Sequence, residues 1–261
     1  MLDFKQIRDQ YPDKLHVFGK ALLREFLQYK ILQAIFEGKM ADKLVFLGGT
    51  ALRIIHGNNR FSEDIDLDNF GLTWQEFGEM IKGVERLLRL EGFEVETRNV
   101  SKGAYRCYIK FPSLLYQQKL SPYKEEKILI QVDTAGQGFE YEPEIRILNK
   151  FDVFTEIRVT PMDILLSQKI YTAVSRKRIK GRDFYDISFL MGLTKPNYKF
   201  LYEKMGIKGP KQLKKEFLVK IKDYDFKKLV VDVRPFLIDD VQIKRVEKFR
   251  DWWEGVDMGV L

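Results

Sequence analysis

The chain has 261 residues, of which 45% are hydrophobic and 13% aromatic, so it can bury one large core or two modest ones and is not intrinsically disordered. No apolar run approaches the roughly 20 residues that span a bilayer, and the N-terminus MLDFKQIRDQYPDKL is too charged for a secretion signal, so we expect a cytoplasmic protein without a membrane partner. The one cysteine and two histidines argue against an internal disulfide and against zinc or histidine-based metal centres, and the net charge of +7 favours a polyanionic partner only weakly.

Taken in chain order, the first elements are a long helix, a short strand and a glycine turn. Residues 17–37 place apolar side chains at helical spacing and stop at Gly38. KLVFL at 43–47 predicts a buried strand. The next residues, Gly48 and Gly49, predict a turn that leads into a helix over 50–56.

An acidic strand and an amphipathic helix come next. DIDLDNF at 64–70 alternates acidic and apolar residues, as a strand does when only one of its faces is buried. Residues 73–92 predict an amphipathic helix with Thr73 as its N-cap. Beyond this helix, period-two alternation predicts strands at 93–100, 104–112, 127–134 and 153–160.

From Pro161 onward, strand patterns give way to helical ones. PMDILLSQKIYTAVSRK begins with a proline in a first helical turn, and RDFYDISFLMG and Lys-rich amphipathic segments follow. The sequence therefore predicts an α+β domain over residues 1–160. A helical domain over 161–261 is expected to pack against it, with a cleft between the two.

The acidic strand has the chemistry of a metal site. Asp64 and Asp66 share a face while Ile65 and Leu67 point to the core. Two neighbouring carboxylates repel by about 4 kcal/mol at an effective dielectric near 20, so they need either solvent or a divalent cation. Mg²⁺ suits this setting because it prefers carboxylate and phosphate oxygens. Asp68 is the weakest candidate, since it can equally be a cap or a surface acid.

The glycine turn supplies the matching phosphate site. Gly48 and Gly49 allow close backbone approach, and Thr50 opens a helix whose N–H groups attract phosphate. Taken alone, a Gly-Gly pair is usually a plain turn, and a D-x-D is usually a solvated strand edge. Together, about 15 residues apart on consecutive elements, they indicate a nucleotide–metal site.

The stretch GGTALRIIHGNNRFSEDIDLD resembles the signature of the AbiEii/AbiGii toxin family, a branch of the polymerase-β-like nucleotidyltransferases. The family pattern GG[TS]AL followed by R-[FY]-S-x-D-[IL]-D-[LF] matches residues 48–67. LLSQKIYTAVSRKRIKGRDFYDISFL at 165–190 resembles the family's downstream lysine and R-D-[FL]-Y-D element. The resemblance covers roughly residues 20–190. It implies a polymerase-β-like core with a mixed or antiparallel sheet and flanking helices.

The resemblance also implies roles for further residues. Asp133 is the candidate third metal ligand, although an acid at a strand end is an equal alternative. Lys169 is implied to bind the triphosphate, and Asp183 is implied to be essential for function. Asp183 could orient Lys169 or contact the base or ribose, and Asp186 could be a helix-stabilising acid.

The remaining candidates flank these motifs. Arg60 and Ser62 are expected at the nucleotide, with a bracing role in the loop as the alternative for Arg60. A basic run is expected to contact a nucleic-acid backbone, although it could equally be a solvated helix end. Its members are Arg176, Lys177, Arg178, Lys180 and Arg182.

The leading interpretation is a Mg²⁺-dependent nucleotidyltransferase, with Mn²⁺ as the alternative ion and a nucleoside triphosphate as substrate. The resemblance implies an RNA acceptor, with a tRNA 3′ end the best guess. It also implies a toxin–antitoxin pair whose antitoxin need not touch the toxin. Two other classes stay open: a transferase that modifies a small-molecule or protein hydroxyl, and a catalytically inactive RNA- or nucleotide-binding module.

Overall fold

The computed structural model describes residues 3–257, and its contacts divide them into two compact units. Unit 1 contains the residues up to 56 together with 62–159. Unit 2 contains 160 onward together with the short segment 57–61. The main boundary between the units lies close to residue 160, where the sequence placed it. The sequence did not predict that residues 57–61 belong to unit 2.

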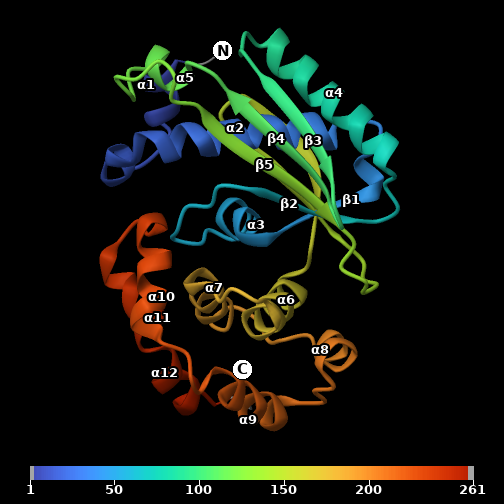
Figure 1. The fold of residues 1–261 in the computed structure, drawn as a ribbon, viewed down its shortest axis with the longest axis vertical. Coiled ribbons are helices and arrows are strands. Elements are labelled where there is room, and N and C mark those ends of the chain that lie inside the picture. Colours follow the sequence, from blue (N-terminus) through green and yellow to red (C-terminus); the bar gives the residue numbers. More distant parts are fainter. Residues whose placement is uncertain (1–2, 258–261) are drawn as a thin grey trace. The chain divides into compact units, whose positions relative to one another are not determined.

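Unit 1 is built on one seven-stranded mixed sheet (Figure 1). The strand order is β3-β4-β5-β2-β1-β7-β6, in which β1 pairs with β7 and β2 pairs with β5 in parallel, and the other pairs are antiparallel. The strands are β1 (Leu44–Leu47), β2 (Ile65–Asn69), β3 (Glu96–Ser101), β4 (Tyr105–Phe111), β5 (Ile128–Ala135), β6 (Glu144–Lys150) and β7 (Val153–Val159). The predicted α+β class and mixed sheet are confirmed.

Two helices of unit 1 begin with a capping box. α4 follows a capping box in which Thr73 and Glu76 satisfy each other's backbone amides, which confirms the predicted N-cap. α2 and α4 contact each other; α2 also packs on β5 and β7, and α4 on β3 and β4 (Figure 1). These helices are α1 (Phe4–Arg8), α2 (Gly19–Phe36), α3 (Gly48–Ile54), α4 (Trp74–Leu90) and α5 (Leu114–Gln117), with 3₁₀ turns at Asp13–Phe18 and Ala41–Lys43.

Unit 2 consists of helices packed around an aromatic core. Phe184 contacts Phe226 and Phe249 edge-on, and Trp253 lies 4.5 Å from the Phe217 ring centre. Trp253 is fully buried, so the C-terminal segment packs into this core. The helices are α6 (Met162–Ser175), α7 (Gly181–Leu190), α8 (Tyr198–Met205), α9 (Pro210–Ile221), α10 (Phe226–Val233), α11 (Lys244–Glu247) and α12 (Phe249–Gly255), with 3₁₀ turns at Arg234–Phe236 and Asp240–Ile243. Within residues 3–257, no helix has both the length and the apolar character needed to cross a bilayer.

Candidate active site

The glycine turn lies at the junction of β1 and α3 in unit 1. Gly48 has φ +81°, a left-handed conformation that side chains rarely adopt. The helix α3 begins at Gly48, two residues earlier than predicted. The N-cap residue is Leu47, whose side chain forms no capping hydrogen bond. The N-terminal turn of a helix carries backbone N–H groups without intrahelical acceptors, and such groups can bind phosphate.

Asp66 lies directly against this turn. β1 and β2 run antiparallel with Leu47 opposite Asp66, so the acid sits beside the residue that precedes Gly48. A Cβ atom placed on Gly48 would lie 2.2 Å from Asp66 Oδ2 and 2.9 Å from Asp66 Cβ. Only glycine therefore leaves room for the Asp66 carboxylate at this position.

Asp64 is attached to the same helix through its backbone. The Thr50 hydroxyl donates a hydrogen bond to the main-chain carbonyl of Asp64. Ile65 and Leu67 are buried, whereas Asp64 and Asp66 are each half-buried, as the alternation predicts. The glycine turn and the two acids thus form one connected arrangement within unit 1.

α3 is held in place by a buried ion pair at its far end. Arg53 Nε lies 2.8 Å from Glu25 Oε2 on α2, and Lys150 Nζ and the Tyr11 hydroxyl also bind this carboxylate, at 3.1 and 2.9 Å. Burial opposes the charge of Glu25, but the two cations outweigh it and lower the pKa of the carboxyl. The helix that carries the glycine turn is therefore fixed to the core.

Asp68, the weakest of the predicted acids, has a structural environment. Its side chain is buried and accepts hydrogen bonds from the backbone amide of Gln137 at 2.9 Å and from the Tyr141 hydroxyl at 2.8 Å. It therefore joins β2 to the loop that follows β5, and is neither a cap nor a surface acid.

Asp133, the predicted third metal ligand, is the neighbour of Asp66 in the sheet. β2 and β5 run parallel with Asp66 opposite Asp133. Its carboxylate binds Arg106 from β4, with Nε 2.6 Å from Oδ1, and also accepts from the Gln131 amide at 2.8 Å. Within the described part of the chain, no three metal-ligating side chains cluster. Arg106, which the sequence analysis did not single out, thus neutralises the acid beside Asp66.

A second group of predicted site residues lies in unit 2. Lys169 on α6 reaches two acids on α7: its Nζ is 2.9 Å from Asp186 Oδ2 and 3.6 Å from Asp183 Oδ1. Arg176 lies 2.7 Å from Asp183 Oδ2. The Lys169 side chain is 16% exposed, whereas Asp186 has no exposed surface. The lysine and both acids of the R-D-x-Y-D element therefore form one charged cluster.

Arg60 belongs to this second cluster. Its Nε and Nη2 each lie 2.7 Å from one oxygen of Asp186, and its side chain is only 2% exposed. Burial opposes ionisation of Asp186, but Arg60 and Lys169 outweigh it and lower the pKa of this carboxyl to about 2. The guanidinium that was expected at the nucleotide thus occupies a buried ion pair, which corresponds to the bracing alternative. Ser62 is half-buried in unit 1, where its carbonyl accepts from Gln28.

The predicted basic run divides into paired and exposed residues. Arg176 binds Asp183, Lys180 lies 3.5 Å from Asp232, and the Arg182 guanidinium lies 4.4 Å from the ring centre of Phe236. Lys177 and Arg178, between α6 and α7, are exposed. These two side chains are therefore the members of the run best placed to meet a polyanion.

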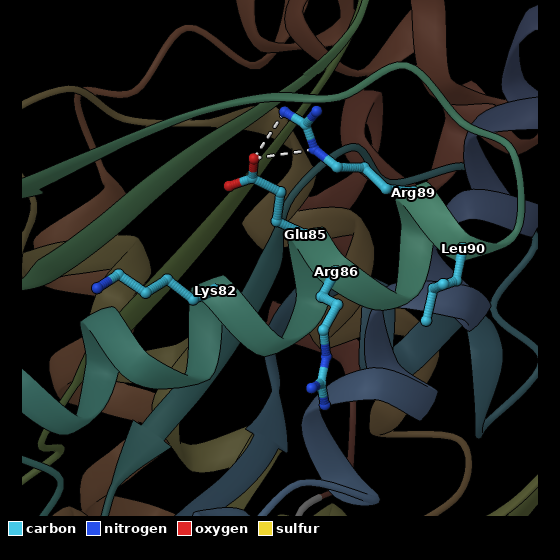
Figure 2. A pocket seen from close by; sticks show the side chains of 5 residues that line it. All are labelled: Lys82, Glu85, Arg86, Arg89 and Leu90. Atoms are coloured by element: carbon cyan, nitrogen blue, oxygen red, sulfur yellow. Dashed lines mark hydrogen bonds and ion pairs between the residues drawn. The ribbon is translucent and has the colours of Figure 1, made fainter.

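A shallow surface pocket lies elsewhere in unit 1, along α4 (Figure 2). Arg89 turns back to Glu85, 2.7 Å away, while Lys82 and Arg86 extend in different directions (Figure 2). None of its lining residues belongs to the glycine turn or to the acidic strand. The hollow is therefore separate from the candidate site.

The sequence profile of one known family matches most of the chain. The match covers residues 30–250, and the family is described as the nucleotidyl transferase AbiEii toxin of type IV toxin–antitoxin systems. The chain belongs to the AbiEii family. Membership confirms the resemblance seen in the motifs, and it implies nucleotidyltransferase chemistry on a nucleotide substrate and an antitoxin partner.

Solved structures support the fold of this AbiEii protein. JHP933 from Helicobacter pylori shares 17% identity and a TM-score of 0.52, over 90% of this chain and 92% of JHP933. A candidate nucleotidyltransferase, also from H. pylori, shares 17% identity and a TM-score of 0.56, over 90% of this chain and 95% of the other. At this identity the likeness concerns the fold alone. No curated protein sequence matches the chain.

Sequence reasoning missed two partners at the AbiEii motifs. Arg106 binds Asp133 from the neighbouring strand, and Asn58 donates to Asp186 at 3.0 Å across 128 positions of sequence. The alternation of AYRCYIKFP placed Arg106 on a strand, but nothing in it gave the register that sets Arg106 opposite Asp133. For Asn58, its place in a Gly-Asn-Asn-Arg turn suggested only a loop.

Proposed function

We propose that this AbiEii-family protein transfers a nucleoside monophosphate from a nucleoside triphosphate to a hydroxyl group at a tRNA 3′ end, and that this reaction makes it toxic. The single observation that carries the proposal is the seating of the Asp66 carboxylate on Gly48, at the first turn of α3. A phosphate-binding turn and a metal-binding acid are useful together only where a phosphate and a cation meet.

The acids fit a divalent cation. Asp64 and Asp66 would hold Mg²⁺, with Mn²⁺ as a substitute, because Mg²⁺ is usually bound by one or two carboxylates together with substrate phosphates. The space above Gly48, which a Cβ would fill, holds the Asp66 carboxylate instead and supports this assignment. When bound, the ion supplies charge stabilisation at the transferred phosphoryl group.

The remaining groups bind and orient the substrates. The Gly48–Thr50 backbone would cradle the triphosphate, because the N-terminal N–H groups and the dipole of α3 favour anions. In unit 2, Lys169 would bind triphosphate oxygens, since its side chain is partly exposed while Asp186 and Asp183 hold its ammonium in place. In-line attack by the acceptor hydroxyl would then release pyrophosphate.

The acceptor is proposed to be RNA for reasons of charge. The chain carries a net charge of +7, and Lys177 and Arg178 are exposed beside the Lys169 cluster in sequence. Contacts of this kind position a nucleic-acid backbone without reading its bases. Arg176, Lys180 and Arg182 would contribute less, because each already has a partner within unit 2.

The test is a transfer assay with each of the four α-labelled nucleoside triphosphates, Mg²⁺ and total RNA. We expect label on RNA of tRNA length, and none with EDTA or with the isosteric Asp66→Asn variant. Glu79→Gln, on the exposed face of α4, serves as the matched control. Label on protein or on small molecules instead of RNA would overturn the tRNA assignment. Growth arrest that persists in Asp66→Asn would favour an inactive binding module.

A further inference from the structure

The segment Gly57–Phe61 is part of unit 2, although it connects α3 to β2, both of which belong to unit 1. Arg60 forms a β-bridge with Leu237, and the Phe61 amide donates to the Phe236 carbonyl at 2.8 Å. The chain that runs from the glycine turn to Asp64 is therefore anchored midway by residues of unit 2.

Arg60 makes this anchor specific. The two 2.7 Å bonds from its Nε and Nη2 to the two oxygens of Asp186 have the paired geometry that a planar guanidinium provides and an ammonium does not. Its Nη1 donates to the Phe61 carbonyl at 3.0 Å, so one side chain fixes both the acid and its own backbone. With only 2% of the side chain exposed, Arg60 acts inside unit 2 and not at its surface.

Asp186 is shared between this anchor and Lys169. The carboxylate that binds Arg60 also lies 2.9 Å from Lys169 Nζ. A fully buried carboxylate between two cations adds little to the free energy of unfolding, because apolar residues of similar volume usually stabilise a fold as well or better. What the ion pairs add is a fixed geometry for the groups they join.

We infer that Arg60 and Asp186 are positioning residues for nucleotidyl transfer. Arg60 fixes the segment that leads into Asp64, and Asp186 fixes the positions of the Arg60 guanidinium and the Lys169 ammonium relative to each other. Neither residue touches the substrate. The inference rests on the proposed function, because it assigns to Asp64 and Lys169 the roles given there.

The kinetic test compares variants that remove the geometry with variants that keep the fold. Arg60→Lys keeps the positive charge but cannot form the two parallel hydrogen bonds to Asp186. Asp186→Asn keeps the size of the side chain and removes its charge. The double variant Arg60→Met/Asp186→Leu, the apolar pair, removes both buried charges. Asp163→Asn is the control, because Asp163 lies on the same helix as Lys169 but binds Asn197. We expect kcat for label transfer to fall about 10- to 100-fold in all three test variants, the range found for groups that orient metal ligands, and to stay unchanged in the control.

Two further readouts separate positioning from mere stability. The Mg²⁺ concentration for half-maximal rate should rise in Arg60→Lys, because Asp64 is less well placed, while the thermal midpoint of the apolar pair should match the wild type. Amide hydrogen exchange over residues 57–64 should accelerate in Arg60→Lys and in the apolar pair but not in Asp163→Asn.

The outcomes distinguish the two proposals. Wild-type protein that labels no acceptor would overturn the proposed function and this inference with it. An active wild type together with wild-type kcat and wild-type exchange in folded Arg60→Lys or in the folded apolar pair would overturn the positioning role alone. Should Asp186→Asn fail to fold, those two variants decide the matter.

Discussion

The carboxylate of Asp66 lies where a side chain on residue 48 would be, so Asp66 can adopt this position only because residue 48 is a glycine. Antiparallel pairing of β1 with β2 brings them together across 18 positions of sequence, because Leu47 lies opposite Asp66. The spacing between the glycine turn and the acids is therefore set by the sheet register. The turn and the strand face that carries Asp66 cannot be altered independently.

Replacing Gly48 with alanine should abolish activity by displacing Asp66. Gly92→Ala is the matched control, because Gly92 has a similar φ of +89° but nothing within 4 Å of an added Cβ. Both substitutions place an alanine at a positive φ and so strain the backbone equally, but only the Cβ of Gly48→Ala collides with the Asp66 carboxylate. We expect transfer to fall about 100-fold or more in Gly48→Ala, as for misplacement by about 1 Å, and to be retained in Gly92→Ala. Equal losses in the two variants would contradict this account.

Asp66 and Asp133 should differ sharply when each is changed to asparagine. Asp66→Asn should lower kcat by more than about 100-fold, because metal binding supplies several kcal/mol of charge stabilisation. Asp133→Asn should cost less than about tenfold, the size of a partly exposed ion pair, because Arg106 already neutralises this acid. Mn²⁺ titration followed by paramagnetic line broadening would measure the affinities. A loss in Asp133→Asn as large as in Asp66→Asn would instead support Asp133 as a metal ligand.

The sequence predicted β5 and β7, each of which buries one face, and missed β6, which buries almost none of its residues. β5 and β7 alternate buried and exposed residues along their lengths, and both were predicted nearly to the residue. β6 was missed because Ile145 and Ile147 are more than half exposed, and of its seven residues only Leu148 is buried. β6 is one of the two edge strands of the sheet, and it is held by pairing with β7, which the hydrophobic pattern does not record.

Local motifs likewise indicated the groups of the site but not all of their partners. Gly48, Asp64 and Asp66 lie on consecutive elements, so the strand–turn–helix pattern was enough to bring them together. Arg60 and Asp186 are 126 positions apart, and no local pattern could pair them or place Arg60 in unit 2.

Asp186 should make stability depend on pH at the acid end. Its pKa in the folded protein is about 2, below the value of 3.8 for the free side chain, so its contribution is fully present above about pH 4 and is lost as the pH falls toward 2. The contribution amounts to about 2 kcal/mol of the free energy of unfolding, since one pKa unit corresponds to about 1.4 kcal/mol. Urea unfolding of the wild type and of Asp186→Asn at a series of pH values between 2.5 and 5 would give the free energy of unfolding and its slope against pH. We expect a shallower pH slope in Asp186→Asn, and parallel slopes would exclude the assignment.

Exposed cations between α6 and α7 should carry RNA binding. Lys177→Gln/Arg178→Gln should weaken binding of total tRNA and reduce the slope of log affinity against log salt by about 1.5, because two phosphate contacts are lost. Lys119→Gln/Lys124→Gln removes the same charge from exposed positions of unit 1 and serves as the control. Filter binding from 50 to 300 mM salt would give both slopes. The assignment fails if the two double variants lose affinity equally, since net charge alone would then explain the binding.

A glycine-to-alanine substitution should lower the free energy of unfolding at the start of α7 and raise it within α4. At Gly181 an added Cβ would lie 2.0 Å from the Leu229 carbonyl oxygen, where α7 begins beside α10, and the Gly181 amide donates to Asp232 at 2.9 Å. The backbone must move, so Gly181→Ala should lower the free energy of unfolding by about 1–3 kcal/mol or more. Gly83 lies exposed within α4 with nothing within 4 Å, so Gly83→Ala should raise it by about 0.5–1 kcal/mol through better helix propensity. Urea midpoints would measure both changes. A neutral Gly181→Ala would mean that α7 and α10 do not approach as closely as this contact requires.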